Sequence, residues 1–376
     1  MRVLIAGDYC PRNRVVDYFE NNRIDTVLGL IRPLITQVDY SIVNLESPVL
    51  PTNEKPIVKR GPSISCTKKG VEALKWAGFN CVTLANNHFL DYGHAGVKET
   101  LRSLDELQVD HVGGGLNSID AGKILYKEIK GKVLAVINCC EHEFSIATNT
   151  TSGCNSLNPI KQYYDIKEAR KKADYVLIII HGGHELYQIP SLRMIETYRF
   201  FIDSGADAVI NHHQHCFSGY EVYKGKPIFY GLGNFCFDEP KLNDKKWNEG
   251  FMVELSLDIT GVSFKIHPYI QCGETPAINP IDPKTFNNKI EELNTIIADP
   301  VKHEQLLSDY YNSTCAQYCN VFEPIRNRFY LKAKDLKLLP SFIGKKRILA
   351  AYNYVLCESH RDRLAFWLEK SVKELK

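Results

Sequence analysis

Short apolar runs alternate with segments of helical spacing over the first two thirds of the chain. Runs rich in strand-forming residues predict strands at 2–7, 40–45, 81–85, 109–112, 175–180 and 206–210. Apolar residues at helical intervals predict helices at 69–78, 97–107 and 191–204. This repeated strand–helix–strand order is typical of an α/β sandwich, and it argues against separate all-α or all-β domains.

Other strands are predicted to pair with their neighbours in sequence. Residues 124–129 and 133–137 flank Lys130-Gly131-Lys132 and form a predicted hairpin. Residues 251–268 alternate well enough for a closing hairpin around Thr260-Gly261. Two more strands are expected at 221–223 and 227–230.

The character of the sequence changes after Pro280. Residues 290–297 and much of 301–376 have helical spacing, with charged residues spread along them and no catalytic-looking constellation. We therefore expect an α/β domain over 1–280 and a helical C-terminal extension over 281–376. The extension either packs on the main domain or offers a surface to a protein partner.

Charge and apolar content limit the environment of the protein. The 376 residues are 24% charged, with a formal net charge of +2, so no strong overall field would attract nucleic acid or an anionic membrane. The apolar opening at 3–6 is too short for a signal peptide, and no later run is long enough to cross a bilayer. A cytoplasmic location is expected, in which the 12 cysteines, none in a CxxC pair, stay reduced.

Polar residues that can bind metal ions lie at or just beyond the ends of five predicted strands. They are Asp8; Asn44 and Glu46; Asn86, Asn87, His88 and Asp91; His181; and His212, His213 and His215. Singly, such an aspartate is usually a turn or cap residue, and such a histidine is usually an ordinary core or surface residue. Strand ends on one edge of an α/β sheet converge, and ligand sites form there. The recurrence at five strand ends therefore predicts one shared site.

The residue types in this set suit one kind of chemistry. Carboxylate, carboxamide oxygen and neutral imidazole together favour divalent zinc, manganese or iron. Two such ions held close together can share a hydroxide, lower its pKa and stabilise a displacement at phosphorus. The lack of thiols in the set fits a catalytic site better than a closed structural one.

Longer motifs surround these residues. They are Gly7-Asp8, Asn44-Leu45-Glu46-Ser47-Pro48, the segment from Leu84 to Gly93, His181-Gly182-Gly183-His184-Glu185, Gly205-Ala206-Asp207 through His215, and Gly231-Leu232-Gly233-Asn234-Phe235. In this order, over residues 2–240, they resemble the motifs of the poly-gamma-glutamate capsule-synthesis (CapA-type) family of the calcineurin-like metallophosphoesterase superfamily. The Asn-Asn-His-x-x-Asp segment and the final histidine cluster are the most specific of them.

The resemblance implies a four-layer α/β/β/α sandwich with one or two divalent metal ions between the strand ends. Carried over by motif, the expected ligands are Asp8, Glu46, Asn87, His181, His213 and His215. Glu46 would bridge the metals, and Asn87 would contribute its side-chain oxygen. His88 becomes the candidate general acid or leaving-group stabiliser, with Asp91 orienting its ring.

Other residues of the motifs have less definite roles. Substrate contact or support of the ligands is expected of Asn44, Asn86, His184, Glu185 and His212, although His212 could exchange roles with His213. In the wider superfamily a metal-binding histidine follows the first motif aspartate by two residues, and here that position is Cys10. This departure leaves one metal short of a ligand, so a site for a single ion stays open.

Four nearby positions are not expected ligands. Asn211 and Gln214 stand where the family usually shows Gly and Pro, which we interpret as local loop variation. Arg12 and Arg14 either bind a phosphate or carboxylate of the substrate or face solvent.

The resemblance supports two functions of different classes. One is a hydrolase in which a metal-activated hydroxide attacks a phosphoester or an amide during capsule or cell-surface polymer biosynthesis. The substrate would be a polymer precursor or a small molecule. The alternative is a non-catalytic metal-binding assembly factor for capsule polymer synthesis. The His88–Asp91 pair favours the enzyme, because a purely structural site needs no proton donor.

Overall fold

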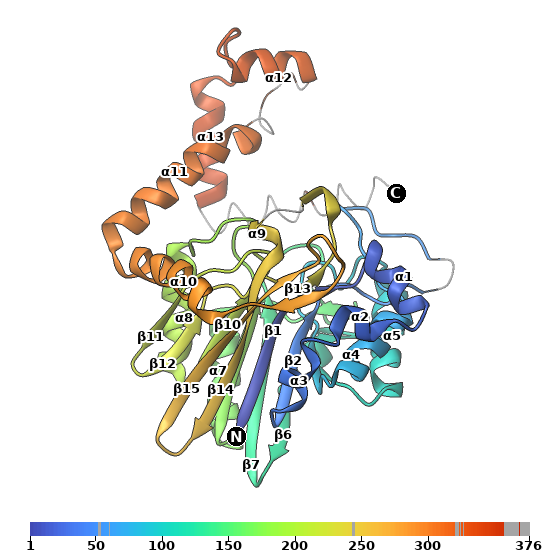
Figure 1. The fold of residues 1–376 in the computed structure, drawn as a ribbon. Helices are drawn as coiled ribbons and strands as arrows, with labels where there is room; N and C mark the ends of the chain where they lie inside the picture. The colour runs from blue at the N-terminus through green and yellow to red at the C-terminus, as the bar shows by residue number, and fades with distance from the viewer. Residues whose placement is uncertain are drawn as a thin grey trace. The chain divides into compact units, whose positions relative to one another are not determined.

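A computed structural model describes residues 1–51, 54–59, 61–242, 245–319, 323, 325, 327–356 and 368. The chain divides into two compact units, Met1–His303 and Glu304–Lys376. The β-sheets all lie in the first unit, and the second unit is helical where it is described (Figure 1). No helix in these described ranges has the length and apolarity needed to cross a membrane.

The larger sheet has eight strands within the described residues. Its order is β16 (Ile278–Pro280), β15 (Gly261–Gln271), β14 (Glu249–Asp258), β1 (Arg2–Cys10), β2 (Tyr40–Leu45), β3 (Cys81–Thr83) and β4 (Asp110–Val112), with β13 (Asn234–Phe237) paired to β1. The pairs from β1 to β4 are parallel, whereas β14 runs antiparallel to β1. Every residue of β2 is buried, as expected for a strand covered on both faces.

The smaller sheet has six strands in the same part of the chain. Its order is β11 (Tyr220–Tyr223), β12 (Lys226–Phe229), β10 (Ala208–His212), β9 (Tyr175–His181), β7 (Lys132–Cys140) and β6 (Leu125–Ile129). The central strands β7, β9 and β10 are parallel, so the carboxyl ends of β9 and β10 lie together. A separate short pair joins β5 (Gly114–Gly115) to β8 (Gly153–Cys154).

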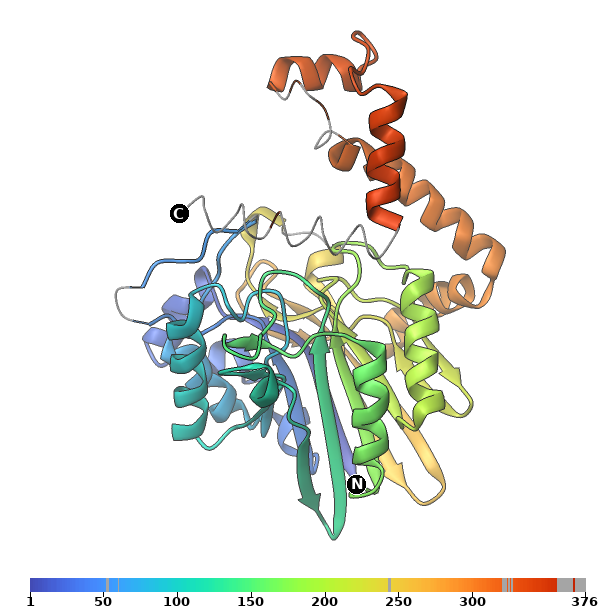
Figure 2. The same cartoon turned by 180° about the vertical axis from the view of Figure 1, so that it is seen from behind.

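Helices cover the outer face of each sheet. The larger sheet packs against α1 (Arg14–Glu20), α2 (Ile24–Leu28), α3 (Arg32–Thr36), α4 (Lys68–Ala77) and α5 (Gly93–Glu106) in one hydrophobic cluster. The smaller sheet packs against α7 (Pro159–Ala169) and α8 (Leu192–Ser204) in another, as Figure 2 shows from behind. The layers run helix, sheet, sheet, helix, which confirms the predicted four-layer arrangement.

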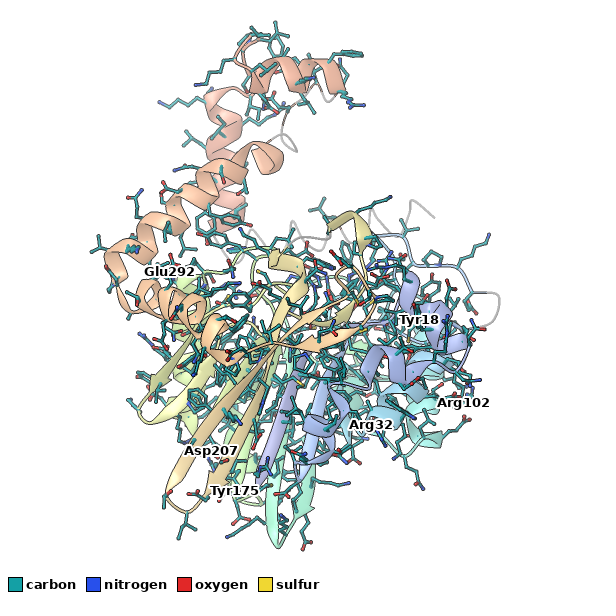
Figure 3. The ribbon with its side chains drawn as sticks, viewed as in Figure 1. Tyr18, Arg32, Arg102, Tyr175, Asp207 and Glu292 are labelled. Carbon is teal, nitrogen blue, oxygen red and sulfur yellow. The ribbon has the colours of Figure 1, made fainter. Side chains whose placement is uncertain are left out.

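Polar side chains of the outer helices lie at the rim of this unit. Figure 3 shows Tyr18 of α1, Arg32 of α3 and Arg102 of α5 there. Arg32 lies over the ring of Trp76, and Arg102 forms ion pairs within α5, so these cations stabilise the helical layer.

Most predicted elements are present, including both hairpins. Helix α4 stops before Gly78, as predicted, because this glycine adopts a left-handed φ of 100° and caps the helix. The three short helices between 14 and 36 were not predicted. With five to seven residues each, they are too short to show a helical period. Helix α7 was also missed, although its Asn158 cap and Pro159 first residue form a recognisable start signal.

Short elements complete the first unit, and helices continue into the second. The short ones are α6 (Ser118–Ala121), η1 (Pro240–Leu242) and α9 (Lys245–Asn248). The later helices are α10 (Pro283–Ala298), α11 (Pro300–Cys319), α12 (Arg328–Asp335) and α13 (Lys345–Leu356). Helix α10 packs against β11 and β15 of the first unit, while the domain boundary near 280 stays a prediction.

Candidate metal centre

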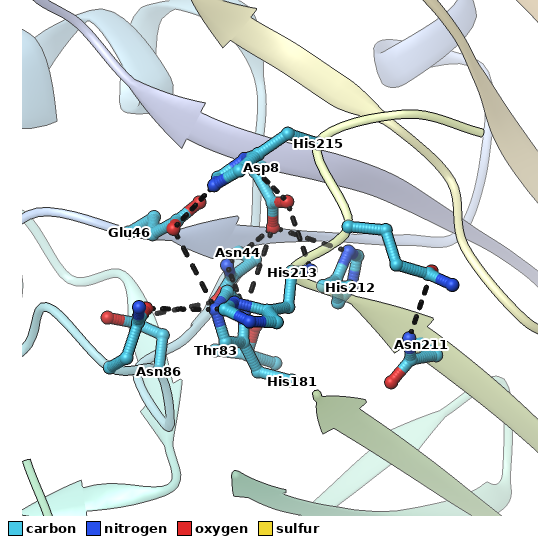
Figure 4. Close-up of polar contacts among 12 residues, drawn as sticks. Asp8, Asn44, Glu46, Thr83, Asn86, His181, Asn211, His212, His213 and His215 are labelled. Atoms are coloured by element: carbon cyan, nitrogen blue, oxygen red, sulfur yellow. Dashed lines mark hydrogen bonds and ion pairs between the residues drawn. The ribbon is translucent and has the colours of Figure 1, made fainter. Parts of the chain in front are cut away.

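The strand ends that carry the predicted site residues converge in the first unit (Figure 4). The register pairs Asp8 of β1 with Asn44 of β2, and His181 of β9 with His212 of β10. The pairing of β1 shifts register on both sides of Asp8, which marks a local irregularity where the strand ends. The two sheets therefore bring side chains from distant parts of the sequence to one place.

Asp8 is held by two donors. Its Oδ1 accepts a 2.7 Å hydrogen bond from Asn44 Nδ2, and its Oδ2 accepts one of 3.2 Å from the His213 backbone N–H. His215 Nδ1 lies 3.7 Å from the same Oδ2. The carboxylate of this buried aspartate thus points into the histidine cluster with a fixed orientation.

Two groups of metal-competent atoms share Glu46. One group is Glu46, His181 and His213, and the other is Asp8, Glu46 and His215; in each, the ligand atoms lie within 4.8 Å of one another. Asn87 adds its Oδ1, which lies 3.1 Å from His181 Nε2. His213 Nδ1 lies 3.1 Å from the same Nε2. The arrangement offers two neighbouring positions with one carboxylate common to both.

The donor atoms fit a divalent cation. Both oxygens of Glu46 are buried, and neither has a hydrogen-bond partner among the described residues. Buried polar atoms without partners are costly, and a cation would supply the missing one. Burial, with the negative charge of Asp8, raises the pKa of Glu46 well above its usual range. A nearby cation would offset this by favouring the ionised carboxylate.

The histidines of the cluster are suited to be neutral ligands. Burial lowers the pKa of His213 to about 3, and burial together with His213 lowers that of His181 well below its usual value. Each imidazole therefore keeps a ring nitrogen lone pair at neutral pH, as metal binding requires. His213 and His215 also adopt φ values of 95° and 56°, which are uncommon outside glycine and asparagine.

Asn44 and Asn86 support the cluster through hydrogen bonds to its donors and to the neighbouring strand ends. Besides its bond to Asp8, Asn44 Nδ2 lies 3.2 Å from His181 Nδ1, and Asn44 Oδ1 accepts a 3.2 Å bond from Thr83. Asn86 donates to the Leu45 carbonyl at 2.8 Å. These contacts tie the ends of β2 and β3 together, so the two asparagines support the donors.

His88 and Asp91 form the predicted pair at the edge of the cluster. His88 Nδ1 lies 2.7 Å from Asp91 Oδ2, within hydrogen-bonding distance. His88 also lines a pocket of about 240 Å³ together with Asn87 and His215. The ring is therefore oriented by a carboxylate beside the metal-competent donors and faces a space that a ligand can enter.

The remaining predicted residues lie around this centre. His212 points toward Asp8, with Nδ1 3.6 Å from Asp8 Oδ1, and neither of its ring nitrogens has a hydrogen-bond partner in the described structure. It belongs to neither donor group, whereas His213 does. Glu185 lines the pocket, and His184 is not among the described lining residues.

The two arginines near Asp8 have different surroundings. Arg14 makes a bidentate contact with Asp238 and donates to the Cys272 and Gly273 carbonyls at 3.0 Å, so its role is to tie chain segments together. Arg12 lines the pocket, 3.6 Å from Glu239. Of the two, only Arg12 is placed to meet a ligand there.

Asn211 and Gln214 are structural. Asn211 donates to the carbonyls of Gly182 and Tyr230 at 2.8 and 3.0 Å, and accepts a 2.7 Å bond from the Tyr198 hydroxyl. Gln214 accepts from Asn211 at 3.3 Å. Together they hold the loop after β10 against the smaller sheet.

Two neighbours of the candidate centre were missed from the sequence. Asn138 of β7 accepts bonds from the Leu84 and Ala85 N–H groups at 3.2 and 2.8 Å and donates to Ile179 at 3.0 Å, which fixes the start of the Asn86–Asp91 segment across the two sheets. A single asparagine inside an apolar strand could have indicated this. Lys59 contacts both His88 and Asp91, and its irregular segment gave no signal.

Comparison with known proteins agrees with the motifs. A family model described as bacterial capsule synthesis protein PGA_cap matches residues 2–239. The capsule biosynthesis protein CapA of Bacillus anthracis is 34% identical over 247 residues, which cover 64% of this chain and 60% of that protein. The PGA biosynthesis protein CapA of Bacillus subtilis strain 168 is 32% identical over 237 residues, covering 62% of each. The chain therefore spans less than two thirds of either relative.

One solved structure shows only a distant similarity. A hypothetical protein from Thermus thermophilus aligns with a TM-score of 0.44 at 19% identity, covering 74% of this chain and all (100%) of that one.

Proposed function

Because the chain belongs to the bacterial capsule synthesis protein family PGA_cap, we propose that it is a metal-dependent hydrolase in the biosynthesis of a capsule or another surface polymer. The observation that carries this proposal is the position of Glu46, a buried carboxylate that is shared by two donor groups and accepts no hydrogen bond from the described residues. The substrate would be a polymer precursor or a small molecule with a phosphoester or amide bond.

The donors divide into two proposed metal positions. Glu46, Asn87, His181 and His213 would hold one ion, and Asp8, Glu46 and His215 the other. Cys10 is fully buried and belongs to neither donor group among the described residues. With one donor fewer, the Asp8 position is expected to bind its ion more weakly.

The residues of the chain have separate roles in the proposed reaction. Bound divalent ions supply an activated water and stabilise negative charge that develops on the substrate. Asp91 accepts the hydrogen bond from His88 Nδ1–H, which leaves Nε2 to exchange a proton with the leaving group. Asn44 keeps Asp8 and His181 in place through its contacts with both, and Asn86 ties its own segment to the end of β2 at the Leu45 carbonyl.

Metal content and hydrolysis, measured on the same protein, test this proposal. We expect manganese, zinc or iron by mass spectrometry, and turnover of a generic phosphodiester or a gamma-glutamyl amide. His88→Ala should keep the metal and lose turnover, whereas His213→Ala should lose metal. His111→Ala, at a partly exposed histidine paired with Asp105, is the matched control and should change neither.

The possible results separate the two functions predicted from the sequence. Equal metal loss in His88→Ala and His213→Ala would contradict the division of roles. Bound metal without turnover of either substrate would instead support the assembly factor, with the C-terminal helices as a candidate partner surface. Absence of metal from the wild-type protein would overturn both.

A further inference from the structure

Lys59 is fixed beside the candidate centre by the segment that carries it. This segment connects β2 to α4 and has no helix or strand of its own at 54–59. Asp91 holds it at two points, since its carbonyl accepts a 2.8 Å bond from Ile57 N–H and its Oδ2 accepts one of 2.7 Å from Ile64 N–H. The lysine between these points therefore has a defined position.

The ammonium of Lys59 is buried next to the His88–Asp91 pair. Only 3% of the lysine side chain is exposed, and it forms an ion pair with Asp91 Oδ1. Its Nζ lies 3.2 Å from His88 Nδ1 and 5.9 Å from the centre of the Phe144 ring. A buried lysine is rare unless its charge has a partner, so this placement is a specific feature of the site.

The ammonium of Lys59 has more N–H donors than hydrogen-bond acceptors among the described residues around it. A protonated lysine has three N–H donors and no acceptor. His88 Nδ1 cannot accept from it while donating its own proton to Asp91 Oδ2 at 2.7 Å. Within the described residues, Lys59 then has Asp91 Oδ1 as its counter-charge in an ion pair, and that oxygen accepts no hydrogen bond.

The unused donors belong to a side chain that lines the same pocket. Lys59 borders the space of about 240 Å³ together with His88, Asn87 and Arg12. Glu143, Glu185 and Glu239 also line it, so the pocket carries both signs of charge. Glu239 lies 3.6 Å from Arg12, and burial raises the pKa of Glu143, which favours its neutral form.

We infer that Lys59 is a substrate-binding residue that contacts a negatively charged oxygen of the substrate next to the leaving group. The ligand class is a phosphate or a carboxylate, because both accept charged hydrogen bonds from an ammonium. This assignment rests on the proposed hydrolase function, since it places the anion beside His88 in the same pocket. It also explains why a cation is kept buried where Asp91 alone would suffice to orient His88.

Binding of two probes tests the assignment without relying on turnover. Inorganic phosphate and glutarate are titrated calorimetrically into wild-type protein, Lys59→Met and Lys59→Arg, with metal content measured on each sample. Lys59→Met should weaken binding by about 10- to 100-fold, the usual value of a charged hydrogen bond, with unchanged metal content. Lys59→Arg should keep most of the affinity. Lys224→Met, at an exposed lysine paired with Asp203, is the matched control and should bind as the wild type does.

The two probes identify the source of the anion. A loss confined to phosphate assigns Lys59 to phosphoryl substrates, and a loss confined to glutarate assigns it to carboxylates. If Lys59→Met does not fold, the double variant Lys59→Met/Asp91→Asn is compared with Asp91→Asn alone, which retains the cation. Unchanged affinity for both probes in metal-containing protein overturns the assignment. Lack of metal in the wild type contradicts the proposed function instead, and the same titrations on metal-free protein still test Lys59.

Discussion

Asp91 combines several structural tasks at the level of a single residue. It orients His88, pairs with Lys59 and accepts hydrogen bonds from the backbone N–H groups of Ile57 and Ile64. Its carboxylate is fully buried, so each contact replaces one that water would otherwise make. The aspartate of the Asn-Asn-His-x-x-Asp motif therefore matters for the wall of the pocket as well as for the histidine.

The burial of this pair predicts a large stability effect. Asp91→Asn should lower the free energy of unfolding by about 3–5 kcal/mol, because it leaves the Lys59 ammonium buried without its counter-charge. Urea denaturation measures the change. Asp203→Asn removes an exposed partner of Lys224 and should have a far smaller effect. Equal, small losses in both variants would show that the Lys59–Asp91 pair is not buried as described.

At the level of elements, the close approach of β1 to the 231–233 segment just before β13 positions Asp8. A Cβ atom on Gly7 would lie 1.9 Å from the Gly233 carbonyl oxygen, which belongs to backbone and cannot rotate away. The Asp8 N–H donates to that same oxygen at 3.3 Å. Glycine at position 7 thus permits the contact that fixes Asp8 relative to β13.

A methyl group at this contact should therefore disturb both stability and metal binding. Gly7→Ala is expected to destabilise the protein by about 1–3 kcal/mol, as overpacking usually does, and to reduce metal content by displacing Asp8. Thermal unfolding and metal analysis measure the two effects. Gly273→Ala is the control, because the nearest atom to its added Cβ lies at 3.7 Å. Normal metal content in Gly7→Ala would show that this strand contact does not position Asp8 for metal binding.

At the level of the whole molecule, the packing of two sheets buries all six proposed ligands. Burial raises the pKa of Asp8 and of Glu46, and it lowers the pKa of His213 to about 3. In the metal-free protein the carboxyls therefore retain protons to higher pH than usual, while the histidines are already neutral. Metal binding should release protons from the carboxyls and not from the imidazoles.

This proton release makes metal affinity depend on pH. Affinity should rise as pH increases toward the raised carboxyl pKa values, by about tenfold per pH unit for each proton displaced. Calorimetry in two buffers of different ionisation enthalpy measures the number of protons. An affinity that does not change with pH, with no proton released, would mean that the carboxyls are already ionised before metal binds.

The sequence by itself predicted the main strands and a set of candidate site residues, and the resemblance of its motifs to a known family implied the four-layer arrangement. Burial along a strand follows local periodicity, and the motif residues lie where apolar runs end, so both are visible without coordinates. Glu46, His181 and His213 belong to this predictable set, and the structure brings them into one group. Short helices such as α2 escaped prediction because five residues contain little more than one turn.

Only the tertiary structure decided which side chains meet. Arg14 is engaged by Asp238, 224 residues away, and Asn138 of the smaller sheet binds the backbone that precedes Asn86 of the larger one. Lys59 reaches His88 from a segment without a periodic pattern. Such contacts depend on sheet packing and on the path of irregular chain, which place side chains to within a few ångströms. A pattern of apolar and polar residues encodes burial and period, and it does not encode those distances.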